Sequence, residues 1–560
     1  MDKIWLQHYP PGVPAEINPD EFSSVPAMLA HITRRFGDRP AYSSFGKTLS
    51  YADIDVLSGR FAAYLHGELK LARGTRVALM MPNLLPYPAC LFGALRAGCT
   101  VVNCNPLYTA HELEHQLCDS GAEVIVILEN FAHVLAQISH KIPVSHIVIV
   151  RMGDMQSLLK GALLNLVVRY VKKLVPSYAL PGATNLAAAL AAGAQHAVPS
   201  LHLRSDEVAF LQYTGGTTGV AKGAMLSHRN IIANVMQARA WVGQDVVEGE
   251  EIIITALPLY HVFSLMANCL LFGMLGGLNV LIANPRDIPG LVKELKRHRF
   301  TAITGVNTLF AALLRNPDFA KVDFSHMRIS LGGGAAVQRS VAEQWLAVTG
   351  KPLVEAYGLT ETSPAVSINP IRQREYTGSI GQPLPSTEIC IRDDADTACA
   401  LDGRGEICIR GPQVMQGYWN RPDETAAVLG EDGFLRSGDI GIMDERGFVR
   451  IVDRKKEMIL VSGFNVYPSE VEAAVGEVPG VLEAAAISVP DERTGEAVKL
   501  FVVRKDETVT VESLIAHCHE NLTGYKIPHQ IEFRDELPKS NVGKIMRRQL
   551  REEEMKKRAG

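Results

Sequence analysis

A run of small and hydroxylated residues that ends in a lysine is the first feature of this 560-residue chain able to do chemistry. It reads YTGGTTGVAKGA and lies between an apolar run and a helical pattern. Glycine lets a backbone approach an anion closely, threonine hydroxyls add donors, and lysine adds charge. The pattern predicts a phosphate-binding loop that is not a Walker A motif, although alone it also fits a flexible connection. Its candidate residues are Tyr213, Thr214, Gly215, Gly216, Thr217, Thr218, Gly219 and Lys222.

A second run has the spacing of a metal site. The sequence HELEH at 111–115 satisfies H-E-x-x-H, the helix motif of zinc peptidases. However, Thr109 and Glu112 have the spacing of a capping box at a helix start, which accounts for Glu112 locally. No third ligand is identifiable, so we expect an ordinary helix and not a zinc site.

Composition excludes several classes of protein. With 56 Lys and Arg against 60 Asp and Glu, the chain has no overall positive field that would attract nucleic acid. Its nine cysteines form no C-x-x-C pair and are odd in number, which indicates reduced thiols and not a disulfide framework. The first residues lack the apolar stretch of a secretory signal. We therefore predict a cytoplasmic, multidomain globular protein without a nucleic-acid partner.

Alternating apolar runs and helical patterns predict the fold class α/β, with a parallel sheet. The strand-like runs lie at 76–82, 99–106, 123–130, 146–152, 208–214, 251–258, 278–285, 300–306 and 327–334. From about residue 370, short strands and Gly/Pro turns indicate a smaller β-rich subdomain. After Asp453, a spacing typical of a capping box, Ser469-x-x-Glu472, opens a separate α+β pattern. We predict a large N-terminal domain at 1–452 and a small α+β domain at 453–560.

Two apolar segments bear on membranes. Residues 262–283 carry no charge and are long enough to span a bilayer, but a Gly-Gly pair interrupts them, so we predict a buried helix and strand. In 156–178, apolar residues share one helical face and polar residues the other. That polar face carries Asn165, Arg169, Lys172 and Lys173. Such a helix either lies in the interface of an anionic membrane or packs its apolar face on its own domain, and the sequence leaves both open.

Four further motifs follow the phosphate loop. They are GGGAAV (332–337), EAYGLTETSP (355–364), DGFLRSGDIGIMDERGFVRIVDRKK (432–456) and PKSNVGKIMRR (538–548). In this order and spacing, the five motifs resemble the ANL adenylating superfamily, and 432–456 with GFNVYP at 463–468 is similar to its fatty-acyl-CoA synthetase signature. The resemblance implies a mobile C-terminal domain and a long-chain fatty-acid–CoA ligase activity. Such an enzyme uses ATP and Mg²⁺ to make an acyl-adenylate and then transfers the acyl group to CoA, with release of AMP and pyrophosphate.

The resemblance also implies roles for single residues. A fatty carboxylate and the α-phosphate of ATP repel each other, so their reaction requires cations where charge accumulates. Lys544 matches the lysine that bridges these two anions, Glu361 matches the carboxylate that holds Mg²⁺, assisted by Thr214, and His261 matches a histidine near the acyl carboxylate. The nucleotide-binding positions are Gly333, Gly334, Ala335, Tyr357, Gly358, Thr360, Asp439 and Arg454. Asp453 matches the hinge of the C-terminal domain, and Gly463 matches the face used in the CoA step.

Two other interpretations remain. Another acyl- or aryl-CoA ligase, or an acyl-AMP ligase, shares all of these motifs. A lipid-binding membrane protein without turnover fits 156–178 but leaves the phosphate loop, Glu361 and Lys544 without a purpose. The expected partners are fatty acid, ATP and CoA and, if 156–178 faces lipid, an anionic membrane at the cytoplasmic face of the inner membrane.

Overall fold

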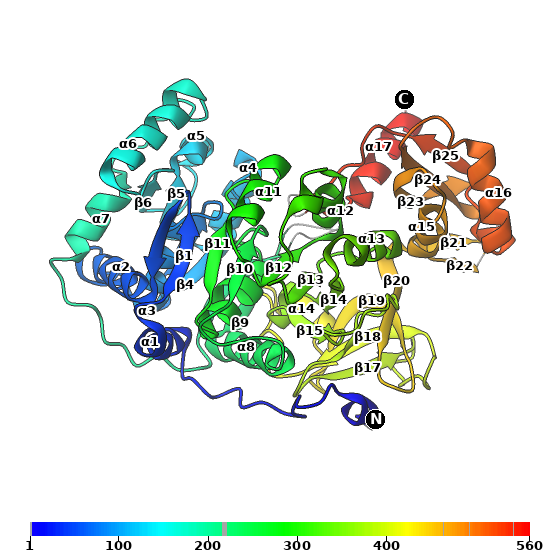
Figure 1. Cartoon of the computed structure of the whole chain (residues 1–560), viewed down its shortest axis with the longest axis horizontal. Coiled ribbons are helices and arrows are strands. Elements are labelled where there is room, and N and C mark those ends of the chain that lie inside the picture. Colours follow the sequence, from blue (N-terminus) through cyan, green and yellow to red (C-terminus); the bar gives the residue numbers. More distant parts are fainter. Residues whose placement is uncertain (1–2, 215–220, 463, 492, 541–542, 560) are drawn as a thin grey trace.

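The chain folds into a large α/β body followed by a smaller α+β unit at the C-terminus (Figure 1). The structure is a computed structural model that describes residues 3–214, 221–462, 464–491, 493–540 and 543–559. Both parts have buried apolar cores of their own; in the C-terminal unit, apolar side chains are buried on both faces of its sheet. The predicted fold class, a large N-terminal α/β domain with a small C-terminal domain, is confirmed.

One sheet of the large body carries the ends of the predicted phosphate loop. Its order is β7 (Thr184–Asn185), β6 (His146–Val150), β5 (Val124–Leu128), β3 (Arg76–Met80), β4 (Thr100–Asn103), β8 (Val208–Tyr213) and β9 (Gly223–Ser227). All neighbours are parallel except the β8–β9 hairpin. The accompanying helices are α3 (Pro86–Arg96), α4 (Ala110–Ser120), α5 (Ala132–Ile138), α6 (Leu158–Leu166), the π-helix η4 (Val167–Val171) and α7 (Leu186–Gly193).

A second sheet carries the remaining four predicted strands, β10 to β13. Its order is β16 (Gln382–Pro383), β15 (Ala365–Ile368), β14 (Val354–Gly358), β13 (Ile329–Gly332), β12 (Ala302–Gly305), β10 (Ile252–Thr255), β11 (Leu278–Leu281), β1 (Pro40–Ser44) and β2 (Lys47–Ser50). Its middle strands are parallel, and β1–β2 and β14–β15–β16 are antiparallel at its edges. The other helices that precede the β-rich subdomain are α1 (Val25–Phe36), α2 (Tyr51–Ala63), α8 (His228–Val242), α9 (Val262–Ser264), the π-helix η5 (Leu265–Leu271), α10 (Phe272–Met274), α11 (Ile288–Arg297), α12 (Asn307–Arg315) and α13 (Arg339–Thr349).

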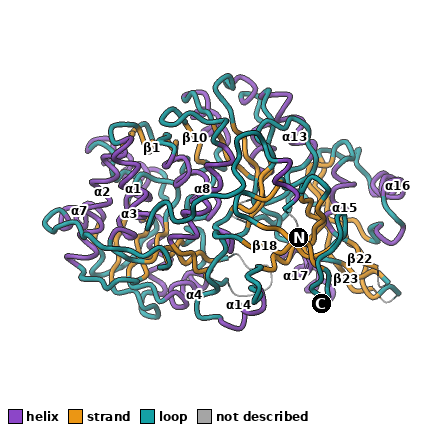
Figure 2. The backbone as a smooth tube through the Cα atoms, turned by 90° about the horizontal axis from the view of Figure 1, so that it is seen from below, coloured by secondary structure: helices purple, strands orange, loops and turns teal. Residues whose placement is uncertain are grey.

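The strand-like runs are therefore strands, but they divide between two sheets instead of forming one. Sequence periodicity identifies a strand and not its neighbour, since pairing is set by contacts between distant segments. Figure 2 shows the strands of both sheets and the helices around them from below. Short 3₁₀- or π-helical turns complete this part: η1 (Ile4–His8), η2 (Tyr64–Glu68), η3 (Glu129–Phe131), η6 (Phe319–Lys321) and η7 (Thr360–Thr362).

The predicted β-rich subdomain is an antiparallel sheet. Its strands are β17 (Glu388–Arg392), β18 (Gly405–Arg410), β19 (Leu435–Met443) and β20 (Val449–Arg454), and α14 (Pro422–Val428) precedes β19. The C-terminal sheet has the order β22 (Phe464–Val466), β21 (Ile459–Val461), β24 (Gly495–Arg504) and β23 (Val481–Asp491), with β25 (Gln530–Phe533) paired to β24. Around it lie η8 (Lys455–Glu457), α15 (Pro468–Gly476), α16 (Val511–Asn521), η9 (Gly524–Lys526) and α17 (Arg547–Ala559).

The two predicted capping boxes have different outcomes. Thr109 and Glu112 form theirs at the start of α4, as expected. The box at Ser469 and Glu472 is wrong: α15 begins at Pro468, and the Glu472 carboxylate accepts hydrogen bonds from Arg547 Nε and the Ala486 N–H, both at 2.8 Å. A guanidinium from another helix offers a charged, bidentate partner, which is stronger than a local backbone bond.

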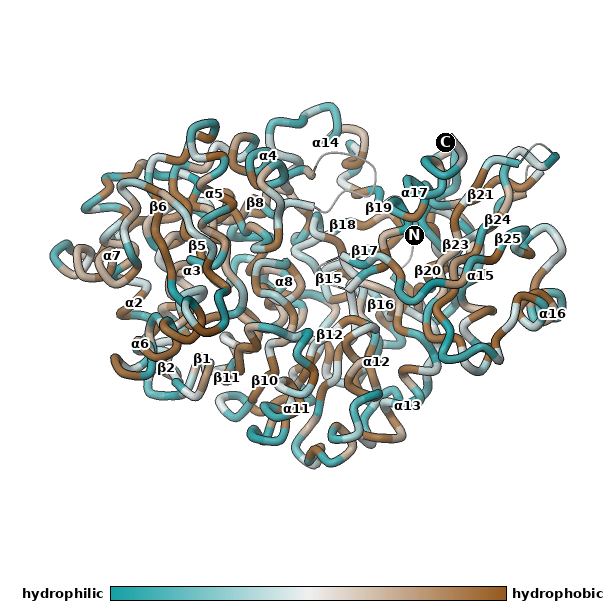
Figure 3. The backbone as a smooth tube through the Cα atoms, turned by 90° about the horizontal axis from the view of Figure 1, so that it is seen from above, coloured by the Kyte–Doolittle hydropathy of each residue, from teal (hydrophilic) through white to brown (hydrophobic). Residues whose placement is uncertain are grey.

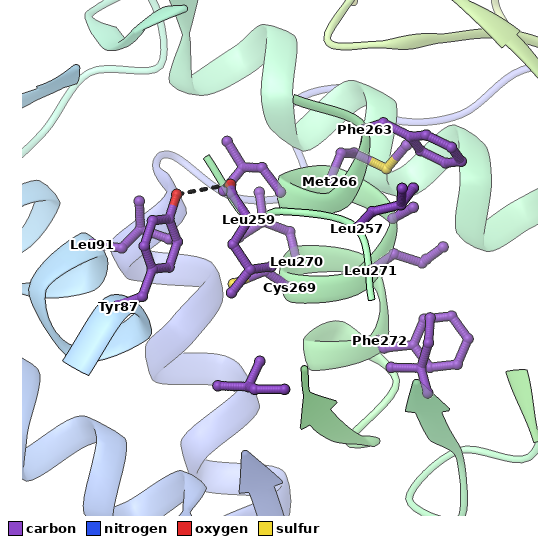
Figure 4. Close-up of a cluster of buried hydrophobic side chains, with 14 of the residues drawn as sticks. Tyr87, Leu91, Leu257, Leu259, Phe263, Met266, Cys269, Leu270, Leu271 and Phe272 are labelled. Atoms are coloured by element: carbon purple, nitrogen blue, oxygen red, sulfur yellow. Dashed lines mark hydrogen bonds between the residues drawn. The ribbon is translucent and has the colours of Figure 1, made fainter. Parts of the chain in front are cut away.

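Two further sequence predictions concern metals and membranes. In the part of the chain that the structure describes, no group of three or more His, Cys, Asp or Glu side chains could hold a metal ion. Residues 262–283 form the predicted buried helix and strand, α9–η5–α10 and β11; Figure 4 shows this segment packed near Tyr87, whose hydroxyl donates to the Leu259 carbonyl at 2.8 Å. None of the described helices has the length and apolarity to cross a bilayer.

Candidate active site

The described ends of the phosphate loop are held together by the β8–β9 hairpin. The Thr214 N–H donates to the Lys222 carbonyl at 2.9 Å, and the Tyr213 hydroxyl donates to Asp119 Oδ2 at 2.7 Å. The Lys222 ammonium pairs with Glu424 and lies 5.1 Å from the centre of the Tyr418 ring. Gly215, Gly216, Thr217, Thr218 and Gly219 lie outside the described residues. The hairpin therefore brings a hydroxyl and a cation to the two ends of the loop.

Glu361 is fixed by a tyrosine that the sequence did not single out. It lies in η7, directly after β14, and its Oε1 accepts a 2.7 Å hydrogen bond from the Tyr418 hydroxyl. Burial, and then the charge of Glu361, raises the pKa of Tyr418, so its hydroxyl remains a donor. In the sequence, Tyr418 is marked only by its place in the aromatic run GYW at 417–419. No motif with a fixed spacing connects it to Glu361.

Asp439 is the centre of a buried polar cluster. It faces Arg454 across the β19–β20 ladder, with Arg454 Nε 3.1 Å from its Oδ1, and its Oδ2 accepts the Tyr357 hydroxyl at 2.6 Å. Burial, followed by the negative charge of Asp439, raises the pKa of Tyr357 well above its ordinary value. Tyr357 of β14 and Arg454 of β20, both predicted to bind nucleotide, therefore contact the carboxylate of Asp439 on β19, which carries the same prediction.

The glycine-rich turn after β13 lies beside this cluster. A Cβ on Gly333 would lie 3.1 Å from both the Ala356 carbonyl and the Phe263 ring, and Gly334 has a φ of +76°. Side chains at these positions would close the space next to β14. Gly358, at the end of β14, passes so close to Pro364 that a Cβ would lie 1.9 Å from its carbonyl oxygen. The predicted positions Ala335 and Thr360 lie on the same two turns.

Lys544 reaches the same site from the C-terminal unit. The Ser540 N–H donates to the Lys544 carbonyl at 2.7 Å and so closes the loop that carries Lys544. The Thr308 hydroxyl of α12 donates to the Gly543 carbonyl at 3.3 Å. Burial and then the charge of Arg454 lower the pKa of Lys544 to about 8, although Asp439 and Glu457 oppose this shift. The Lys544 ammonium makes no hydrogen bond or ion pair with the residues that the structure describes. A desolvated cation without a partner is costly unless an anion binds beside it.

His261 supplies a neutral donor close to that lysine. It caps α9, where its Nδ1 accepts the Phe263 N–H at 3.3 Å, which leaves the proton of the neutral ring on Nε2. Burial, and then the charge of Lys544, lowers the pKa of His261 to about 4. Apolar side chains of α9 and η5 follow it directly, among them Phe263 and Met266 (Figure 4).

The predicted hinge residue joins the two units. Asp453 accepts hydrogen bonds from its neighbour, the Arg454 N–H, at 2.6 Å and from the Ser469 N–H at 2.7 Å. Burial raises its pKa. Close by, Arg547 of α17 pairs with Glu457 of η8 and Glu472 of α15 and so ties the loop of Lys544 to these two elements. No motif indicated this role for Arg547. Gly463 lies outside the described residues.

The assembled site can hold a ribose-bearing polyanion next to a second anion. A buried carboxylate suits ribose hydroxyls, while Arg454 and Lys544 provide positive charge near it and Lys222 provides it at the phosphate loop. His261 adds a hydrogen-bond donor at the border of an apolar segment. Such a site fits the joining of a nucleotide phosphate to an apolar acid.

Comparisons with known proteins agree with this chemistry. The AMP-binding enzyme family matches residues 29–419, and the AMP-binding enzyme C-terminal domain matches residues 470–544. A long-chain-fatty-acid–CoA ligase of Escherichia coli O157:H7 is 56% identical over 553 residues, which cover 99% of this chain and 98% of the relative. One from Haemophilus influenzae is 52% identical over 561 residues and covers 100% of both chains. The crystal structure of ATP-bound MatB from Rhodopseudomonas palustris matches with a TM-score of 0.80 and 28% identity and covers 94% of this chain and 98% of that one. From the site and these matches together it follows that the chain belongs to the AMP-binding enzyme family.

Proposed function

We propose that this protein is a long-chain fatty-acid–CoA ligase. It converts a fatty acid and ATP to acyl-AMP and pyrophosphate and then transfers the acyl group to CoA, with release of AMP. The observation that carries this proposal is the desolvated Lys544 ammonium, which lies near the Asp439–Arg454 pair and His261 without a partner among the described residues. The full-length similarity to ligases of this name supports the substrate class.

The adenylation step follows from the charges of the site. The fatty carboxylate attacks the α-phosphate, and negative charge increases on the oxygens between them. Lys544 neutralises both groups, and the Nε2–H of His261 orients the carboxylate by a hydrogen bond. Asp439 accepts the ribose hydroxyls, and Tyr357 packs against the base. Because Lys544 and His261 are desolvated by burial, their interactions with these anions are stronger than they would be in solution.

Mg²⁺ fits this site as a partner of ATP. We infer that Glu361, with the hydroxyl of Thr214, holds it, since Mg²⁺ is usually bound by one or two carboxylates together with phosphate oxygens and water. The hydrogen bond from Tyr418 uses one oxygen of Glu361 and orients the carboxylate. An ion held there would supply positive charge that screens the phosphate oxygens.

Release of AMP with oleate as the substrate tests the ligase activity. We expect AMP and oleoyl-CoA in equal amounts when CoA is present, and little AMP without CoA, because the acyl-adenylate then stays bound. The same assay across acids of increasing length, with ferulate as an aryl acid, separates the alternatives. Faster turnover of the aryl acid than of oleate, or equal AMP release with and without CoA, would contradict the proposed substrate or acceptor.

We also propose that the C-terminal domain, 453–560, turns about Asp453 between the two half-reactions. Proline at 453 fixes φ, removes an N–H and deletes the carboxylate that binds the Arg454 and Ser469 amides. We expect Asp453→Pro to keep pyrophosphate exchange within about 3-fold of the wild type and to slow thioester formation by about 100-fold. Asp453→Asn serves as the control, since it keeps the backbone. Equal loss of both half-reactions in the proline variant would show that 453 is not the hinge.

The proposed function includes a location in the cell. We propose that the protein works in the cytoplasm, in peripheral contact with an anionic membrane at the cytoplasmic face of the inner membrane, through residues 156–178. Four basic and no acidic residues in this segment support the contact. Long-chain fatty acids partition into bilayers, so this contact would bring the enzyme to its substrate.

A further inference from the structure

The segment α6–η4 turns its apolar face away from the protein. Seven large apolar side chains within or directly after this segment are more than half exposed, most of them on that face: Leu158 (93%), Leu159 (89%), Leu163 (61%), Leu166 (51%), Tyr170 (69%), Val171 (65%) and Leu174 (55%). A surface helix of a soluble protein normally buries such a stripe. The interpretation in which this helix packs its apolar face on its own domain is therefore wrong.

Two polar side chains of the same segment, Asn165 and Arg169, face the protein and anchor the helix. Asn165 Oδ1 accepts the Gly153 N–H at 2.8 Å, and Arg169 pairs at 3.1 Å with Glu129, which is buried. Gly161 and Gly153 pack backbone to backbone, since a Cβ on Gly161 would lie 2.6 Å from the Gly153 carbonyl oxygen. The exposed apolar face is thus the result of specific contacts on the other side, and Arg169 is not part of a free basic face.

A second segment, distant in sequence, completes the surface. The Lys160 ammonium donates to the Phe45 carbonyl at the tip of the β1–β2 hairpin, and Gln156 Nε2 donates to the Ser44 carbonyl at 3.2 Å. Phe45 is 42% exposed. A Cβ on Gly46 would lie 3.2 Å from Lys160 Nζ and 3.3 Å from Arg297 Nη2, so these cations flank the tip. Figure 3 shows apolar α6 beside β2 at the edge of the molecule.

Charge selects the partner of this surface. The chain as a whole has a net charge of −4, yet 156–178 has no acidic residue, and Lys160, Lys172 and Lys173 remain basic beside the paired Arg169. Lys47 and Arg297 add positive charge at the hairpin. Lys172 and Lys173 are exposed at the end of η4. Apolar insertion together with several basic residues is the combination that holds peripheral proteins on anionic bilayers.

We propose that α6–η4 and the tip of the β1–β2 hairpin form one docking surface for an anionic lipid bilayer. This inference rests on the proposed membrane contact of 156–178 and extends it to a second insertion point, Phe45. The leucines enter the interface along the helix, Phe45 enters beside them, and Lys160 links the two elements. Two points of insertion fix the orientation of the enzyme on the membrane, which a single helix would leave free to rotate about its own axis.

Sedimentation with vesicles of phosphatidylcholine, with and without phosphatidylglycerol, tests the docking surface on the full-length protein. We expect binding that requires the anionic lipid. Leu159→Ser with Leu163→Ser should weaken it by about 30-fold, and Phe45→Ser alone by about 5-fold. Both changes are at exposed side chains, so stability should be unchanged. Leu401→Ser with Val511→Ser, at apolar positions that are 46% and 38% exposed elsewhere, is the matched control and should bind as the wild type does.

Each other outcome decides against a part of the inference. Unchanged vesicle binding by the double leucine variant would overturn the surface, and loss in that variant without any loss in Phe45→Ser would overturn the second insertion point. A wild-type dimer that becomes a monomer in the leucine variant would show that a second copy covers this face instead. AMP release with oleate delivered from detergent micelles, without vesicles, reports on the ligase activity separately: its absence in the wild type would contradict the proposed function and leave the vesicle result as a test of docking.

Discussion

Alanine at position 544 is expected to slow acyl-adenylate formation by about 1,000-fold. The ammonium is the cation closest to both reacting anions in the proposed mechanism, and alanine leaves no positive charge in its place. Oleate-dependent exchange of pyrophosphate into ATP measures this step. Thioester formation from synthetic oleoyl-AMP and CoA should remain within about 3-fold of the wild type, because the phosphate bond is already made.

Lys539 provides the matched control for this variant. It lies on the same C-terminal segment but pairs with Glu483 outside the site, so Lys539→Ala should leave exchange nearly unchanged. Equal slowing by both variants, or equal loss of both half-reactions in Lys544→Ala, would mean that the loop and not the ammonium is required.

The pH dependence of the same step follows from the lowered pKa of Lys544. In the enzyme without ligands, the charged form is lost as the pH rises through about 8, since burial disfavours it. We therefore expect kcat/KM for adenylation to fall above about pH 8. Arginine stays charged throughout this range, so the residual activity of Lys544→Arg should show no such fall. A wild-type profile that is flat up to pH 10 would contradict the assignment.

Replacing Glu361 by glutamine is expected to lower the rate of adenylation by about 100-fold and to raise the Mg²⁺ concentration needed for half-maximal rate by about 10-fold or more. Glutamine has the size of glutamate and retains an oxygen that accepts the Tyr418 hydroxyl, so the local fold should persist. What it lacks is the negative charge that attracts a divalent cation. Titration of Mn²⁺ by electron paramagnetic resonance, with a non-hydrolysable ATP analogue present, measures the metal affinity without turnover.

The second half-reaction is the internal control for this variant. Transfer of the acyl group from oleoyl-AMP to CoA involves no pyrophosphate, so Glu361→Gln should perform it at nearly the wild-type rate. Unaltered Mn²⁺ affinity together with slow adenylation would remove Glu361 from the metal site and give it a role in positioning only.

Local patterns in the sequence were enough to predict the strands and one helix start. Val77, Val101 and Val126 belong to apolar runs that became β3, β4 and β5, because a strand buried on both faces requires such a run wherever it pairs. The Thr109–Glu112 capping box formed as predicted, since both partners lie within one turn of helix. The division of the strands between two sheets was not predictable, because it depends on pairs such as β1–β11, which are more than 200 residues apart.

The amino-acid sequence by itself determined which chemical groups are present and the short-range structures that carry them: the glycine-rich turn at 333, the carboxylates at 361 and 439, and the lysine at 544. Only the tertiary structure decided how they meet. It brought Tyr357, Arg454 and Lys544 around Asp439. It also paired Glu472 with Arg547, where the sequence predicted a cap at the start of its own helix, and it left the leucines of α6 exposed. The physical reason is that periodicity reveals that a face is apolar or a group charged, whereas its partner is selected by competition among all the groups that folding brings within reach.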